Sequence, residues 1–294
     1  MADSARGLAG DFKRFLAAQE EDELLDISRP RAQTDLPPAA LHHNATKQNA
    51  GVSTAPKMAE NSTLTVDFPH ANTQPPAPVE EPTMNKTDKI RALNELAEVI
   101  KTCTRCPLGA TRLNAVPGEG NVSADVMFVG EGPGFDEDRQ GRPFVGRAGQ
   151  LLDKMILAMG LTREKVFIAN IAKCHPMVDP LHPEKHGNDR APNAQEIACC
   201  RKYIEQQIAI VCPKYVIALG GVAAKALISD ADSLGALRGK FHTLHLDSAE
   251  LPKPVQIIAT YHPAALLRNP NWKKDAWQDL QMVMDKLGLK GARK

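Results

Sequence analysis

Acidic and aromatic side chains gather in one glycine-rich stretch, residues 130–152, which reads GEGPGFDEDRQGRPFVGRAGQLL. The carboxylates of Glu131 and Glu137 and the flat ring of Phe144 lie on a backbone that glycine opens to close approach by another group. The stretch directly follows an apolar run, residues 124–129, which has the composition of a buried strand. This order predicts a ligand pocket at the end of a strand, although glycine-rich turns between strands and helices also occur without any ligand.

Six cysteines form a second group with possible chemistry. Cys103 and Cys106 make a Cys-x-x-Cys pair, Cys174 lies in the motif KCHP, and Cys199 and Cys200 are adjacent on a predicted helix. A close pair with two distant single thiolates suits an iron–sulfur cluster or zinc. A redox Cys-x-x-Cys and unliganded thiols remain alternatives on spacing alone.

Cys212 and the adjacent pair Cys199 and Cys200 are considered separately. Successive helical residues diverge by about 100°, so only one of Cys199 and Cys200 can face a given centre. Cys212, which precedes a proline, is expected to be a buried core thiol.

Four apolar runs alternate with helical patterns and must position these groups. The alternation predicts an α/β fold, a three-layer sandwich in which helices flank a central, mostly parallel four-stranded sheet. Loops at the carboxyl ends of parallel strands share one edge of the sheet, so we expect them to converge on one cleft. The predicted strands are residues 124–129, 165–170, 214–219 and 255–260, and the loops that follow them are residues 130–145, 170–176, 220–221 and 261–268.

The amino-terminal part differs in composition from the rest of the chain. Residues 1–85 hold 7 Lys and Arg against 12 Asp and Glu, with 9 of the 22 prolines, whereas the remainder holds 29 basic and 23 acidic residues. We predict a disordered, acidic, proline-rich arm over residues 1–85, with a short amphipathic helix at residues 7–25 that could bind a protein partner. The folded domain is expected to span residues 86–294 and to begin with a helix capped by Thr87.

The sequence shows no signal for a membrane span or for export. No run of 18 apolar residues occurs, and the amino terminus lacks the basic-then-apolar order of a secretory signal. We therefore expect a cytoplasmic protein without a membrane partner, in which six cysteines favour thiolate ligands or buried thiols over disulfides.

Several motifs together resemble one enzyme family. The sequence GEGPGFDED is followed in order by GRPFVGRAGQLL, NIAKCHP, NAQEIACC and TYHPAALLRNP, with the Cys-x-x-Cys ahead of them. Over residues 87–288 the chain resembles the family-4 uracil-DNA glycosylases, the iron–sulfur branch of the uracil-DNA glycosylase superfamily. The resemblance implies a monomeric enzyme of base excision repair. It would act at the nucleoid on uracil-containing DNA, flip the uracil out, hydrolyse its N-glycosidic bond and leave an abasic site.

The resemblance also implies a structural 4Fe–4S cluster. Its ligands would be Cys103, Cys106, Cys174 and Cys200, because the Glu-x-x-x-Cys of the family is met by Glu196 and Cys200. Cys199 then falls where the family commonly has a small residue.

The resemblance implies roles for the pocket residues as well. Phe144 would stack under the flipped base, Asn170 would read the uracil edge, and His262 would stabilise the negative charge on the departing base. Without the resemblance each residue has an ordinary alternative role. Phe144 could pack in the core, Asn170 could form a turn after a strand, and His262 could cap a helix. Leu266, Leu267 and Arg268 would form the wedge that fills the space left in the DNA.

This sequence departs from the pattern of the family in two places. Other branches of the superfamily carry a water-positioning Asp where this chain has Gly132, a residue that we still expect to contact the base. We predict instead that Glu137 orients the water or supports the cationic sugar, and that Glu131 anchors the pocket. Residues 177–190 form a longer link than is usual in the family, and we expect a solvated excursion whose histidines fit no common zinc pattern.

Other functions remain open at this point. A related branch binds uracil-DNA covalently through a histidine, but its Arg-Arg-Ile-His signature is absent from this sequence. A uracil-DNA binding module without turnover and an iron–sulfur interaction factor acting through the acidic arm are the alternatives.

Overall fold

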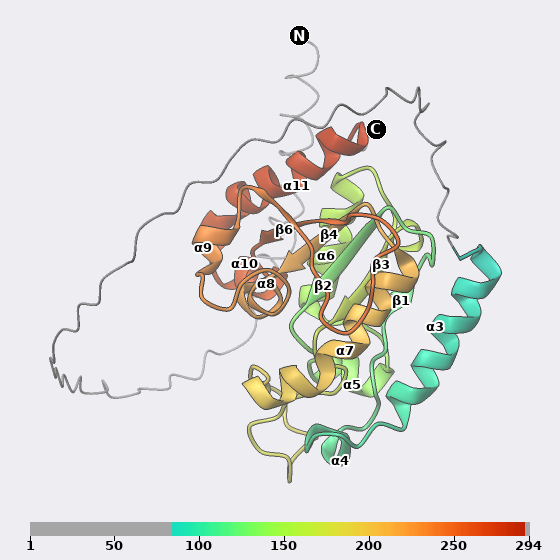
Figure 1. The fold of residues 1–294 in the computed structure, drawn as a ribbon. Helices are drawn as coiled ribbons and strands as arrows, with labels where there is room; N and C mark the ends of the chain where they lie inside the picture. The colour runs from blue at the N-terminus through green and yellow to red at the C-terminus, as the bar shows by residue number, and fades with distance from the viewer. Residues whose placement is uncertain (1–83, 292–294) are drawn as a thin grey trace, which may run out of the picture. The chain divides into compact units, whose positions relative to one another are not determined.

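A six-stranded sheet forms the centre of the protein in the computed structural model, which describes residues 84–291 (Figure 1). The predicted arm therefore lies almost wholly outside the described residues, as does its predicted helix at residues 7–25. The strand order is β1-β3-β2-β4-β6-β5. The strands are β1 (Glu119–Gly120), β2 (Val126–Gly130), β3 (Phe167–Asn170), β4 (Tyr215–Leu219), β5 (Phe241–Thr243) and β6 (Gln256–Thr260).

The four central strands, β3, β2, β4 and β6, are parallel, as the sequence predicted. The predicted strand number was too low, because β1 and β5 add an antiparallel strand at each edge. β1 has two residues and β5 has three, which is too short for an alternating pattern to reveal them in the sequence.

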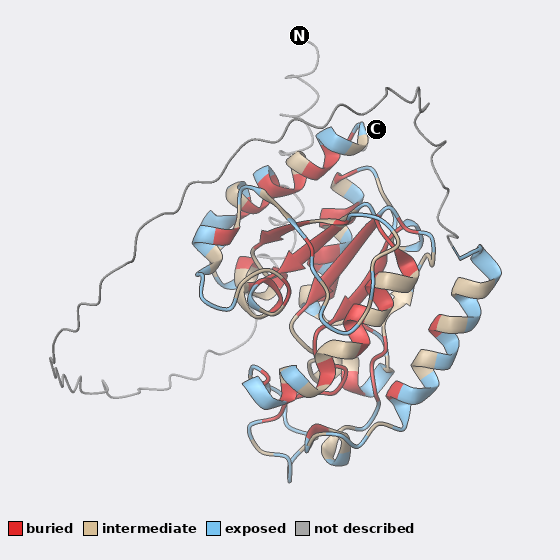
Figure 2. Ribbon diagram, in the orientation of Figure 1, coloured by how far each residue is buried: buried red, intermediate tan, exposed pale blue. Residues whose placement is uncertain are grey.

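Side chains of the central strands alternate between two apolar layers. Val126 and Phe128 of β2 pack on one face with α6 (Arg147–Ala158) and α11 (Lys273–Leu287). Met127 and Val129 pack on the other face with α7 (Ala194–Val211) and α8 (Gly221–Leu227). Figure 2 shows the four central strands as mostly buried. Burial on both faces explains why the strands read as continuous apolar runs.

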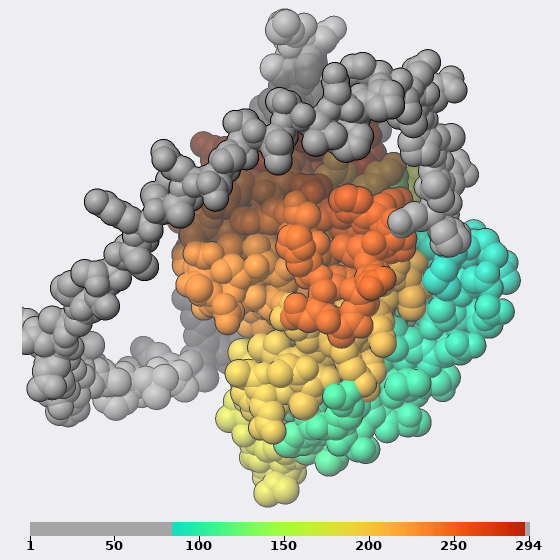
Figure 3. Space-filling view, in the orientation of Figure 1, coloured from blue at the N-terminus to red at the C-terminus, as the bar shows by residue number. Residues whose placement is uncertain are grey.

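The remaining helices lie around this three-layer core. α3 (Lys86–Lys101) contacts α7, and Figure 3 shows its residues along one flank. Its cap is Asn85 and not the predicted Thr87, because the Asn85 side chain accepts a hydrogen bond from the amide of Asp88. The other short elements are α4 (Leu108–Thr111), α5 (Phe135–Gln140), η1 (Arg163–Lys165), α9 (Leu234–Leu237), α10 (Pro263–Arg268) and η2 (Pro270–Trp272).

Two features of the connections position the site. α5 interrupts the segment that the sequence analysis treated as one loop, residues 130–145. The long link at residues 177–190 projects at the lower edge of Figure 3, in yellow. Among residues 84–291, no helix is long and apolar enough to cross a bilayer.

Candidate functional site

A narrow slot forms where β2 ends at Gly130, between Phe144 and Asn170. A Cβ built on Gly130 would lie 2.4 Å from the Phe144 ring and 2.4 Å from Oδ1 of Asn170. No side chain other than the hydrogen of glycine therefore fits at this strand end. Phe144 itself has a left-handed backbone with φ of 53°, which is costly for a bulky residue and is held by its surroundings.

The backbone around Phe144 is fixed by one arginine and one glycine. Arg163 donates to the carbonyl oxygen of Phe144 at 3.1 Å and also to that of Pro143. A Cβ on Gly149 would lie 1.9 Å from the Phe144 carbonyl oxygen, so α6 can approach this turn only with glycine at that position. These contacts stabilise the strained conformation that presents the ring to the slot.

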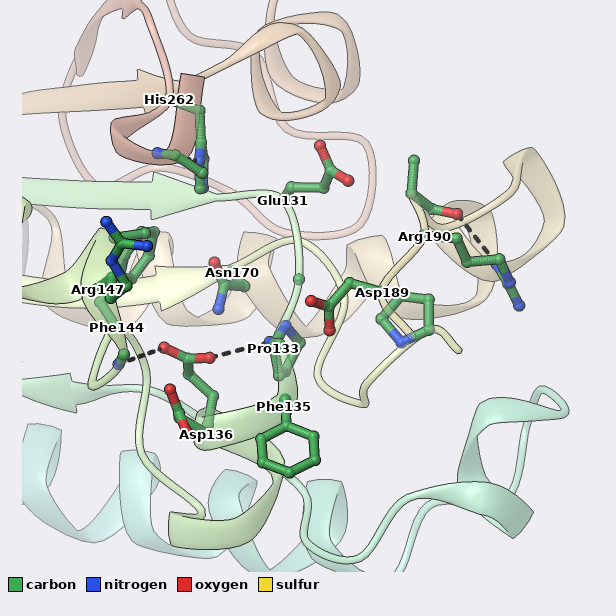
Figure 4. A pocket seen from close by; sticks show the side chains of 18 of the residues that line it. Glu131, Pro133, Phe135, Asp136, Phe144, Arg147, Asn170, Asp189, Arg190 and His262 are labelled. Atoms are coloured by element: carbon green, nitrogen blue, oxygen red, sulfur yellow. Dashed lines mark hydrogen bonds between the residues drawn. The ribbon is translucent and has the colours of Figure 1, made fainter. Parts of the chain in front are cut away.

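Glu137 holds the loop on the other side of Phe144. Its carboxylate accepts hydrogen bonds from the amides of Gly134 at 3.1 Å, Val145 at 2.9 Å and Gly146 at 3.0 Å. Figure 4 shows two of these bonds as dashed lines inside the pocket. Because both carboxylate oxygens bond the backbone, Glu137 ties the start of α5 to the start of α6.

His262 lies at the end of β6, where it caps α10. Its Nδ1 accepts a hydrogen bond from the amide of Ala264 at 3.2 Å, so the neutral ring carries its proton on Nε2. Burial lowers the pKa of His262 to about 4, and nearby Arg268 adds to this effect, so the ring is neutral at pH 7. The ring centroid lies 5.6 Å from that of Phe144. The neutral ring thus lies beside Phe144 in the cavity lining and keeps Nε2–H as a donor that α10 does not use.

Gly220, at the end of β4, makes room for this histidine. It has φ of 89°, and a Cβ placed there would lie 2.9 Å from Cβ of His262. The helix-cap reading of His262 and its predicted chemical role are thus compatible, because one ring nitrogen caps α10 and the other remains available.

Asn170 presents an amide at the end of β3. The residue is 2% exposed, and among the described residues its Oδ1 is a buried atom without a hydrogen-bond partner. Its backbone carbonyl accepts from Nζ of Lys173 at 2.8 Å, and the same ammonium donates to Gln207 at 2.6 Å. An unpartnered buried acceptor is costly unless a ligand supplies the donor.

The slot opens into a cavity of about 560 Å³, a size typical of a ligand pocket. The convergence that we predicted brings Glu131, Gly132, Phe144, Asn170 and His262 together in its lining, and Glu137 also faces it. Figure 4 shows the side chains of Glu131, Phe144, Asn170 and His262 around one space. Burial raises the pKa of Glu131, and Arg268 partly opposes that shift.

One wall of this cavity was not predicted. Most of it comes from the link that we expected to be a solvated excursion, and its lining residues are His186, Gly187, Asp189, Arg190 and Ala191. Asp189 presents a carboxylate that is 54% exposed, and His175 holds its Oδ1 at 2.6 Å. The hydrogen bond from His175 lowers the pKa of Asp189, so the carboxylate is charged at neutral pH. The only sequence signal was an unusual length, which cannot specify which face a loop covers.

His175 joins this wall to the cysteine region. It is fully buried, and its Nδ1 lies 3.6 Å from Asp138. Burial alone would lower the pKa of His175, but the Asp138 and Asp189 carboxylates outweigh it and raise the value to about 9. Asp138 is itself fully buried and accepts hydrogen bonds from the backbone amides of Leu113 and Asn114.

The predicted DNA wedge needs one correction. Leu266 is completely buried in the apolar layer beside α6 and α11, so it cannot enter DNA. Leu267 is only partly buried, and Arg268 is exposed and lines the cavity mouth. Adjacent helical residues point in different directions, and Leu266 is the one that α10 turns towards the core.

The predicted cysteine ligands meet in a second, separate cavity. Its lining includes Cys103, Cys106, Cys174, Cys199 and Cys200. Cys212 lies elsewhere, buried at the end of α7, as expected for a core thiol. Within residues 84–291, no three His, Cys, Asp or Glu side chains are spaced to hold a single metal ion.

Hydrogen-bond donors point at several of these sulfurs. Arg112 donates to Cys174 at 3.0 Å, the hydroxyl of Tyr203 donates to Cys103 at 3.2 Å, and the amide of Lys173 donates to Cys200 at 3.3 Å. Burial raises the pKa of Cys200 to about 12. Buried thiols surrounded by donors suit a group that converts them to thiolates, as a cluster of several irons does.

Cys199 differs from Cys200 in its bonding. Its sulfur donates to the carbonyl oxygen of Arg105 at 3.6 Å, and the residue is only partly buried. Cys200 is buried and receives a backbone hydrogen bond.

A family model and several known proteins place this chain in one group. Residues 117–281 match the Uracil DNA glycosylase superfamily. The chain is 43% identical over 194 residues to a type-4 uracil-DNA glycosylase of Pyrobaculum aerophilum, covering 65% of this chain and 92% of that protein. It is 35% identical over 205 residues to the type-4 enzyme of Archaeoglobus fulgidus, covering 68% and 96%. A type-5 uracil-DNA glycosylase of Pyrobaculum aerophilum matches at 30% over 166 residues, with 51% and 66% covered.

Proposed function

This chain belongs to the uracil-DNA glycosylase superfamily and, within it, to the type-4 enzymes, and we propose that it removes uracil from DNA by hydrolysing the N-glycosidic bond. The product would be an abasic site for base excision repair. The observation that carries this proposal is the slot itself, in which a neutral N–H donor, an unpartnered amide and an aromatic ring surround one space.

Recognition of uracil would rest on Asn170 and Phe144. The amide oxygen accepts from N3–H of uracil and the amide nitrogen donates to O4, whereas cytosine presents the opposite pair. Cytosine in the slot would leave buried polar groups unpaired both on the Asn170 amide and on the base. Such a loss supports discrimination between uracil and cytosine on the order of 10⁴. Phe144 would stack under the base, and the lack of a side chain on Gly130 leaves room for both contacts.

Departure of the base would depend on His262. As the bond between C1′ and N1 breaks, its electron pair moves onto uracil and negative charge gathers on O2. The Nε2–H of the neutral His262 would donate to that oxygen, and a preorganised donor of this kind contributes roughly 3 to 4 kcal/mol to the barrier. The water oxygen then bonds to C1′ and releases a proton.

For the water we favour Asp189 over Glu137. The two oxygens of Glu137 accept three backbone hydrogen bonds, which supports a role in holding the loop. Asp189 is charged, lines the cavity and keeps 54% of its side chain exposed, and it is held by His175 and by the backbone of Phe135. Glu131, whose pKa is raised, we assign to anchoring the start of the loop beside Gly132.

We further propose that Cys103, Cys106, Cys174 and Cys200 hold a 4Fe–4S cluster. The shared cavity and the donors aimed at its sulfurs support that ligand set. The cluster would supply structure, by fixing the segment around Cys174, and no step of hydrolysis passes through it. Arg268 and Leu267 would contact DNA, and we expect the protein to act in the cytoplasm.

The test is cleavage of uracil-containing oligonucleotides followed by alkali, with thymine and cytosine controls. We expect strand breaks only at uracil and a loss of roughly 10² to 10³ in single-turnover rate in His262→Ala. A uracil-dependent gel shift without strand breaks would instead support a binding module that holds the base without turnover.

A further inference from the structure

The far end of the cavity carries a stack of three side chains that the proposed chemistry leaves unused. His186 lies with its ring centroid 3.7 Å from that of Phe135, and the guanidinium of Arg139 lies 3.5 Å from the same centroid. Groups that close to one ring cannot share a face, so Arg139 and His186 cover opposite faces of Phe135. The outer face of His186 is left open, since this residue is exposed and lines the cavity.

The loop that carries His186 is held in place by its own hydrogen bonds. The side-chain amide of Asn188 accepts a hydrogen bond from the backbone N–H of Asp179 at 2.7 Å. It also donates to the backbone carbonyl oxygens of Asp179 and His182. Arg139 also donates to the carbonyl oxygen of Pro183 at 3.2 Å. The imidazole therefore sits on a supported platform, which reduces the entropy lost when a ligand packs on it.

This stack and the uracil slot belong to one continuous cavity. Figure 4 shows Phe135 and His262 at opposite ends of the labelled side chains, with Asp189 between them. A base held by Phe144 and His262 fills only one end of a space of about 560 Å³. The group that occupies the other end must be joined to the flipped nucleotide, and a DNA strand supplies its neighbouring nucleotide.

Charge at this end favours a base over a phosphate. The charged carboxylate of Asp189 lies between the two ends of the cavity and would repel a phosphate, and Arg190, which also lines the cavity, is already paired with Glu196. An uncharged aromatic base meets no such repulsion, and aromatic side chains stack on any base because every base has a π-face.

We propose that His186, supported by Phe135 and Arg139, is a stacking subsite for the base adjacent to the flipped uracil. The inference rests on the proposed glycosylase function and deepens it by naming a second nucleotide contact. The contact is available only when the neighbouring base is free of its own stack, as in single-stranded DNA. The subsite would thus strengthen binding of single-stranded substrates more than that of duplexes.

A thermodynamic cycle tests the contact directly. Single-stranded oligonucleotides carry uracil with a normal base or an abasic residue on its 5′ or 3′ side, and KM is measured for the wild type, His186→Ala and His186→Phe. We expect His186→Ala to raise KM roughly fivefold or more on the intact strand, with kcat little changed. Removing the neighbouring base on one side should raise the wild-type KM similarly and should add nothing in His186→Ala. His186→Phe, which keeps a flat ring, should retain the wild-type KM.

The matched control is His182→Ala, which removes an exposed histidine from the same loop. The His182 side chain does not line the cavity, and the bond that Asn188 makes to its backbone is kept. A fluorescent 2-aminopurine beside the uracil gives a readout apart from activity, because stacking should quench it in the wild type and in His182→Ala but not in His186→Ala.

The outcomes separate the two levels of the proposal. Equal KM values for His186→Ala and His182→Ala, or a His186→Ala effect that persists without the neighbouring base, would overturn the subsite. A wild-type protein that leaves uracil uncleaved but binds it would count against the glycosylase function, and the 2-aminopurine signal would still decide the subsite.

Discussion

Replacing Gly130 with alanine should disable the base slot while leaving the rest of the fold in place. The added methyl group would lie 2.4 Å from both the Phe144 ring and Oδ1 of Asn170. Carbon atoms in contact normally lie about 3.5 to 4.0 Å apart, so one or both side chains must retreat by roughly 1 Å. Phe144 has little freedom to do so, because Arg163 fixes its carbonyl oxygen and its backbone is already in the left-handed region.

The size of the effect follows from that displacement. A misplacement of about 1 Å costs on the order of 10² in rate, and overpacking of a buried site costs about 1 to 3 kcal/mol of stability. We therefore expect Gly130→Ala to lose roughly 100-fold in kcat/KM on uracil-containing DNA. Its midpoint in urea should fall but remain measurable, because the domain buries two full apolar layers against the sheet.

Gly221→Ala is the matched control. Gly221 follows the neighbouring strand β4 at the same edge of the sheet, but a Cβ there meets no atom within 4 Å. Single-turnover cleavage and urea unfolding are measured for both variants. If Gly130→Ala is folded and cleaves uracil-DNA within threefold of the wild type, the slot between Phe144 and Asn170 does not hold the base.

Three further predictions concern separate parts of the molecule. Cys200→Ser should lose most of the bound iron of the anaerobically purified protein, whereas Cys199→Ser should keep it; equal iron contents would refute the assigned ligand set. Asp189→Asn should lower the single-turnover rate on the order of 100-fold with little change in the Kd for uracil-DNA, and a change in Kd alone would assign Asp189 to binding. His262 has a pKa of about 4 when folded against 6.5 ordinarily, so below pH 6.5 the unfolded chain takes up a proton that the folded chain does not. Its contribution makes the wild type about 2 kcal/mol less stable at pH 5 than at pH 7 relative to His262→Gln, as urea unfolding at both pH values would reveal; identical pH dependence in the two proteins would contradict a neutral, buried His262.

The central sheet was predictable because its strands are buried on both faces. Each run of β-branched and aromatic residues ends at a glycine, an asparagine or a polar turn, so the strand ends fell within about two residues of those observed. The meeting of Asn170 and His262 followed from the same logic, since Asn170 ends strand β3 and His262 follows the end of strand β6 by two residues. Topology alone brings such residues together.

The errors share a different cause. Leu266 looked like half of an apolar wedge, but only packing against α6 and α11 decides which of two adjacent leucines is buried. The wall of the cavity depends on contacts between distant residues, Phe135 with His186 and His175 with Asp189, and no local pattern announces them. Glu137 was predicted to orient the water or to support the cationic sugar, and that role stays a prediction. The structure adds a contact that the sequence did not reveal, because the Glu137 carboxylate accepts hydrogen bonds from three backbone amides.

A single short segment connects all three parts of the site. Asn170 presents its amide to the slot, and Lys173 bonds the Asn170 carbonyl oxygen while its own amide bonds Cys200. Cys174 lines the cysteine cavity, and His175 holds Asp189 against the pocket. Residues 170–175 can therefore keep their conformation only if the cysteine cavity keeps its shape. A cluster bound there would set the positions of the Asn170 amide and of the Asp189 carboxylate. If these two groups have the roles proposed above, loss of the cluster would lower activity although it takes part in no chemical step.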